Sequence, residues 1–141
     1  MPPSAPVSPS ISARIIHGSL MLGVVLLWLV AWFVARQTAL PVQALPDRRV
    51  LYIALFLVSA GLFGGAMFTA NRLVPPARGA SQDEWWRVNL GKAILVWALV
   101  EAPAILGTIA YLLTRDFRAL LATFIGLLFF GAYRPSRLFE R

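Results

Sequence analysis

Long apolar runs separated by short polar connectors dominate the chain. Four such runs are present, at about residues 14–35, 49–71, 88–114 and 117–133. A helix needs ~20 predominantly apolar residues to cross a bilayer, and within lipid only a helix or a closed barrel satisfies every backbone polar group. The pattern therefore predicts an all-α integral membrane protein, a bundle of four transmembrane helices with short loops.

The polar segments set the domain limits. Residues 1–12 are rich in Pro and Ser without periodicity, which predicts a disordered N-terminal tail. The transmembrane domain then occupies residues 13–135, and residues 136–141 form a short basic C-terminal tail. No basic residue precedes Arg14, and the first apolar run is too long for a signal core, so we expect that run to be retained.

One connector carries a helix start signal. Pro75 and Pro76 interrupt the chain after the second run. Ser81 with Asp83 and Glu84 is then typical of a capped helix N-terminus with acidic residues in its first turn. We expect the third helix to begin near this point.

Composition supports membrane insertion and excludes several function classes. Charged residues make up 13% of the 141 residues, about half the share in soluble domains, and the apolar share is 59%. The net charge is +7, but the basic residues flank apolar runs, which favours membrane anchors over nucleic-acid binding. Cysteine is absent and histidine occurs once, so we expect no metal site and no intrinsic cofactor. No catalytic motif is present, so we expect no enzyme activity.

Basic and aromatic residues also predict orientation and source. The tails and the 72–92 connector carry eight Lys and Arg, against five on the opposite side, which favours cytoplasmic termini. Arg14 and Arg36 flank the first span, and Trp85 and Trp86 precede the third, so all four are expected as interfacial anchors. Twelve of the thirteen basic residues are Arg, which indicates a bacterial source, hence the inner membrane.

Glu101 is the main chemical candidate, because it lies near the middle of the third apolar run. A carboxylate at bilayer depth is costly unless it faces a bundle interior or an aqueous path. It is therefore either an ion or proton site, or a hydrogen-bonding group between helices of this bundle or a partner. Pro103 lies two residues later and removes a backbone donor, which favours a bend nearby.

The second run contains small residues at helix-packing spacing. Ala60 pairs with Gly64, and Gly61 pairs with Gly65, each in a small-xxx-small pattern. Such residues let two helix backbones approach closely. We expect this segment to pack on another span, with a lipid or cofactor cavity as the alternative.

Residues 98–107, ALVEAPAILG, resemble the second helix of the proteolipid c subunit of rotary ATPases. The similarity extends to a hairpin over residues 54–113, with a partly glycine-rich first helix and a polar connector. It implies that Glu101 occupies the ion-carrying carboxylate position. The regular glycine repeat of that family is missing here, and the first and fourth spans are additional to it.

Two function classes follow. The favoured one is a non-catalytic accessory subunit of a larger bacterial inner-membrane complex, respiratory or otherwise energy-transducing. It would bind membrane lipids and larger integral subunits as a hetero-oligomer rather than a homo-oligomer, with quinone or haem contact from a partner left open. The alternative is a proteolipid-like proton or ion carrier acting through Glu101.

Overall fold

A computed structural model describes residues 8–37 and 48–140, and these residues are helical apart from short turns. No strand occurs within those two ranges. The all-α prediction is therefore confirmed. The elements in chain order are α1 (Pro9–Gln37), α2 (Arg48–Ala70), α3 (Gln82–Thr114), the short 3-10 turn η1 (Phe117–Ala119), α4 (Leu120–Ala132) and α5 (Pro135–Phe139).

Three of these helices, α1, α2 and α3, are long and apolar enough to cross a membrane. The fourth apolar run forms the 13-residue helix α4. At ~1.5 Å per residue α4 rises about 20 Å, less than the ~30 Å of a hydrocarbon core. The prediction of four spanning helices is thus not confirmed: the described chain has three candidate spans, one shorter apolar helix and the small helix α5.

Helix ends differ from the sequence prediction at three places. The first helix begins at Pro9 and so includes residues 9–12, which the sequence assigns to the disordered tail; residues 1–7 lie outside the described part. α3 begins at Gln82, at the predicted start signal, and so extends N-terminally beyond the predicted apolar span of 88–114. Most of the predicted basic tail is the helix α5.

A capping box explains the early start of α3. The Glu84 backbone N–H donates to Ser81 Oγ at 3.3 Å, and the Ser81 N–H donates to Glu84 Oε2 at 3.0 Å. These bonds satisfy donors that a helix start leaves unpaired. The start signal in the sequence is therefore confirmed, and the polar first turns of α3 precede its apolar part.

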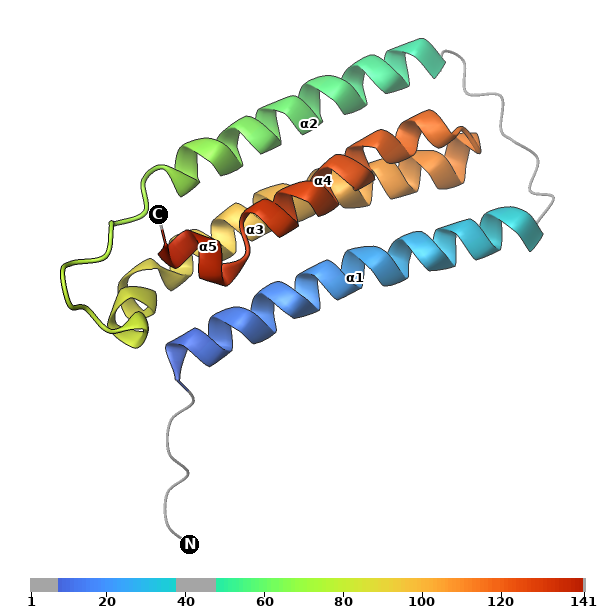
Figure 1. The fold of residues 1–141 in the computed structure, drawn as a ribbon. Coiled ribbons are helices and arrows are strands. Elements are labelled where there is room, and N and C mark those ends of the chain that lie inside the picture. The colour runs from blue at the N-terminus through green and yellow to red at the C-terminus, as the bar shows by residue number, and fades with distance from the viewer. Residues whose placement is uncertain (1–7, 38–47, 141) are drawn as a thin grey trace, which may run out of the picture.

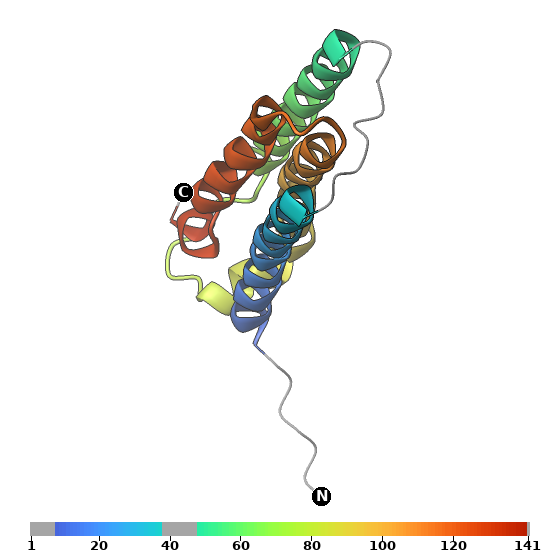
Figure 2. The same ribbon diagram turned by 90° about the vertical axis from the view of Figure 1, so that its right-hand side faces the viewer.

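The central helix of the bundle is α3. α1 and α2 flank it, and α4 runs back along it (Figures 1 and 2). Half of the most apolar 18-residue segment of α3 is buried, against 11% in α1 and in α2. α1 and α2 thus expose most of their apolar surface, which suits a lipid or protein environment rather than water.

Both described chain ends lie at the same end of the bundle, together with the α2–α3 loop (Figure 1). Ser8 Oγ donates to Asp83 Oδ1 at 2.6 Å there. At the opposite end Tyr52 Oη donates to Asp116 Oδ2 at 2.9 Å, which joins the start of α2 to the α3–α4 turn. The apolar parts of the helices therefore lie between two polar ends of the bundle.

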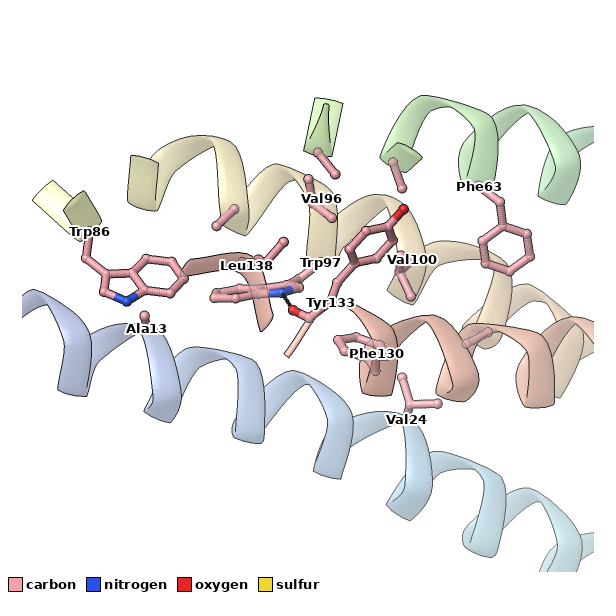
Figure 3. Packing of buried hydrophobic residues seen from close by; sticks show 14 of the residues in the cluster. Ala13, Val24, Phe63, Trp86, Val96, Trp97, Val100, Phe130, Tyr133 and Leu138 are labelled. Carbon is pink, nitrogen blue, oxygen red and sulfur yellow. Dashed lines mark hydrogen bonds between the residues drawn. The ribbon is translucent and has the colours of Figure 1, made fainter. Parts of the chain in front are cut away.

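Aromatic residues of α3 form the centre of the core (Figure 3). Trp86 and Trp97 are fully buried, and Phe130 of α4 packs in the same cluster. Trp97 Nε1 donates to the Tyr133 carbonyl at 2.8 Å, the dashed line in Figure 3. This bond joins α3 to the end of α4.

Small residues bring α3 and α4 close together further along. A Cβ atom added at Gly107 would lie 2.8 Å from the Ala119 carbonyl oxygen, and one at Gly126 would lie 2.8 Å from Ala104 Cβ. Thr123 Oγ1 lies 2.9 Å from the Ala104 carbonyl oxygen. Close backbone approach with threonine hydrogen bonds is how helices associate where no hydrophobic drive exists between them.

Candidate functional site

Glu101 lies near the middle of α3 and is partly buried. No hydrogen bond or ion pair joins its carboxyl group to any described residue. The interhelical bond expected as one alternative is therefore not formed within residues 8–37 and 48–140. Its carboxyl group is then neutralised by a proton, or it pairs with a partner protein or with water in an aqueous path.

The face of α3 that carries Glu101 is next to α1. Trp97, one turn earlier on the same face, has its ring 5.2 Å from the ring of His17 of α1. His17 Nε2 lies 3.0 Å from the Phe130 carbonyl oxygen. The single histidine thus links α1 to α4. The described residues contain no group of three or more His, Asp or Glu that could hold a metal ion.

Pro103 is buried, and α3 continues through it as one helix. Val100, three residues before it, and Ala104, directly after it, lie against Gly126 of α4. The proline thus lies within the packed part of α3. No described titratable side chain is hydrogen-bonded or ion-paired to Glu101. Glu101 and Pro103 are therefore not part of a larger polar site within the described residues.

The predicted packing residues of α2 behave differently. Ala60, Gly61 and Gly64 are exposed, and a Cβ added at Gly61 or Gly64 would meet no atom within 4 Å. A Cβ at Gly65 would make only an ordinary contact, 3.7 Å from Leu99 Cδ1. Gly61 and Gly64 thus face away from the other described helices, whereas Gly65 lies against α3.

The close contact is instead the Gly107–Gly126 region between α3 and α4, which the sequence interpretation missed. A signal was present: Ala122 and Gly126 are small residues four apart, as are Ala104 and Thr108. Hydropathy does not show which of these small-residue pairs form a helix–helix contact, because that depends on which helices are neighbours in space.

The predicted anchors divide into two kinds. Arg14 is exposed, and Arg36 stacks over the Trp32 ring with its guanidinium carbon 3.9 Å from the centroid. Trp85 and Trp86 are instead 5% and 0% exposed, packed edge to face within the bundle. The sequence predicts a role at the membrane–water interface for these two; the structure shows that they pack against other parts of this chain.

Asp116 organises the turn between α3 and α4. The Arg118 backbone N–H donates to Asp116 Oδ1 at 2.9 Å, and Tyr52 donates to the other oxygen. These two bonds, with the positive charges of Arg118 and Arg48, lower the pKa of the Asp116 carboxyl group. The turn is therefore built around an ionised carboxylate.

This arrangement predicts a pH dependence of stability. A carboxyl group whose pKa is lower in the folded state contributes its full stabilisation above its unfolded pKa, about 4, and loses it as the pH falls through the folded pKa. Because Asp116 is only partly buried, the effect is expected to be small. Unfolding followed by tryptophan fluorescence from pH 7 to pH 2.5 should show a Tyr52→Phe deficit that disappears at the acid end. A deficit independent of pH would contradict this.

Comparison of the chain with protein-family models, curated proteins and solved structures finds no match in any of the three.

Proposed function

We propose that this chain is a non-catalytic accessory subunit of a larger membrane assembly, in a bacterial inner membrane and of a respiratory or other energy-transducing kind. The observation that carries this proposal is an exposed face of α2 shaped for another helix. The excess of Lys and Arg at the end that holds both tails supports cytoplasmic termini.

This face, here called the α2 seam, is regular. Its members recur at steps of three and four residues, the spacing of a helix–helix contact line, and all are exposed: Ala54, Leu57, Gly61, Gly64 and Phe68. Leu57 and Phe68 are 62% and 58% exposed. Two glycines between large apolar side chains leave the α2 backbone open to close approach by a partner helix.

A pair of leucine substitutions tests the α2 seam. Gly61→Leu with Gly64→Leu places two large side chains on the seam, and because nothing lies within 4 Å of either site, the chain itself should fold normally. Pull-down of the tagged variant from its own membranes should recover at least tenfold less of the larger subunits. Gly23→Leu, on an exposed and equally open site of α1, is the matched control. Equal recovery for both variants would contradict a role for the seam.

The second candidate function is a proton or ion carrier acting through Glu101. It is favoured by the mid-helix position of this residue and by its lack of a partner among the described residues. The resemblance of residues 54–113 to the proteolipid c subunit hairpin supports the same role. No described groups form a second carboxylate or metal-binding cluster beside it.

Glu101→Gln separates the two functions. An accessory subunit should tolerate the change with only a modest loss of assembly, since glutamine keeps the shape and a hydrogen-bonding group. A carrier should lose transport, because glutamine cannot bind and release a proton. Proton flux into vesicles reconstituted with the variant, with the wild type, and with the exposed-site control Glu140→Gln distinguishes these outcomes.

A further inference from the structure

An apolar groove lies between α2 and α4, two helices that both pack on α3 but touch each other little. It has a volume of about 500 Å³. Its walls are large apolar side chains, chiefly Leu55, Phe56 and Phe63 of α2 with Leu121 and Ile125 of α4. The volume falls within the usual range of small-ligand sites.

The groove has a closed end and an open end. The Phe63 ring stacks on Phe129 of α4, with centroids 4.8 Å apart, and bridges the two helices beyond the groove. At the other end the groove continues into a second hollow, because Tyr52, Phe56 and Arg118 line both. The groove therefore opens toward the end of the bundle where α2 begins.

This open end is positively charged. Arg48, Arg49 and Arg118 line the second hollow, and Asp116 beside it is held by the Tyr52 hydroxyl and the Arg118 backbone N–H. Among the described residues, three arginines lie here with one carboxylate, so positive charge is in excess. Two of the arginines begin α2, whose first turn has no acidic residue. Positive charge at a helix N-terminus is unfavourable, so an anion bound here would stabilise it.

A polar atom in the apolar wall also lacks a protein partner. Ser59 is 6% exposed and lines the groove, and its buried Oγ has no hydrogen-bond partner in the described part of the chain. A buried hydroxyl without a partner is destabilising.

The geometry points to a binding site for one anionic phospholipid, with an acyl chain in the α2–α4 groove and its phosphate group at Arg48, Arg49 and Arg118. Charge complementarity selects the anionic headgroup, and the closed apolar end of the groove binds the acyl chain of the lipid. The site uses only residues of this chain, so it is independent of the accessory-subunit proposal.

Native mass spectrometry of the delipidated full chain tests this site. Phosphatidylglycerol is added, and phosphatidylcholine with the same acyl chains serves as the zwitterionic comparison. We expect one tightly held phosphatidylglycerol, bound at least tenfold better than phosphatidylcholine, because each arginine near an anionic surface adds to the attraction. Equal binding of the two lipids would overturn the proposal.

Two variants separate the charged part from the apolar part. Arg48→Gln with Arg49→Gln and Arg118→Gln should remove the tenfold preference, whereas Arg78→Gln with Arg134→Gln and Arg137→Gln, three exposed arginines outside the groove, should keep it. Ala60→Phe, at an exposed position lining the groove, should weaken both lipids alike. Loss of the preference in the control triple variant would contradict the assignment.

Inorganic phosphate and cross-linking distinguish other occupants. Phosphate alone should not displace the lipid at millimolar concentration, because it lacks the acyl chain. Displacement by phosphate would show a free anion site instead. A photo-cross-linker at Ile125, on the groove wall, should capture lipid in native membranes. Capture of a protein helix there would show that a partner subunit fills the groove.

Discussion

Gly126→Leu is expected to destabilise the folded chain by about 3 kcal/mol, near the upper end of the usual cost of overpacking. A Cβ at this position would lie 2.8 Å from Ala104 Cβ and 3.2 Å from the Val100 carbonyl oxygen, so α4 would have to move away from α3. That movement also weakens the hydrogen bond between Thr123 and the Ala104 carbonyl oxygen. Reversible unfolding in mixed micelles, followed by tryptophan fluorescence, measures the change.

Gly131→Leu is the matched control. Gly131 lies on the same helix, is exposed, and a Cβ added there would meet nothing within 4 Å. It should therefore change the free energy of unfolding by less than about 1 kcal/mol, as expected for surface positions. An equal loss in both variants would mean that the α3–α4 contact is not the close one.

Trp97→Ala is expected to cost about 4 kcal/mol, in line with the removal of a large aromatic side chain from a packed core. Trp97 is fully buried, packs against the ring of His17, and donates to the Tyr133 carbonyl at 2.8 Å. Its loss would leave a cavity where α1, α3 and α4 meet and would remove the hydrogen bond to the Tyr133 carbonyl. The midpoint of unfolding in mixed micelles should fall accordingly.

Trp97→Phe separates packing from hydrogen bonding. Phenylalanine retains much of the ring volume but cannot donate to Tyr133, so it should cost about 1–2 kcal/mol. Trp32→Ala, at a partly exposed position of α1, should cost less than Trp97→Ala. A Trp97→Ala variant as stable as Trp32→Ala would contradict the central place of Trp97 in the bundle.

Much of the fold follows from the sequence, for identifiable physical reasons. Long apolar runs predict membrane-type helices because backbone polar groups in lipid must pair within the helix. The Ser81–Glu84 pattern predicts a helix start because capping is local. The fourth span is not confirmed at full length: hydropathy measures apolarity, and α4 is only 13 residues long.

Less of the candidate site follows from the sequence. The position of Glu101 within an apolar run is visible, but its lack of a partner depends on which residues α1 brings near α3. Likewise, small-xxx-small pairs occur on α2, α3 and α4, and only the tertiary arrangement decides which pairs touch. The groove between α2 and α4 has no sequence pattern of its own, because its walls come from helices about 60 residues apart in the chain.

The mass of the complex that holds this chain in its own membranes tests the central claim most directly. The chain is extracted with a mild detergent and analysed intact by native mass spectrometry. The accessory-subunit account predicts a stoichiometric complex with larger integral membrane subunits, lost in the Gly61→Leu and Gly64→Leu double variant. A chain that emerges as a closed homo-oligomer without other subunits would contradict the account.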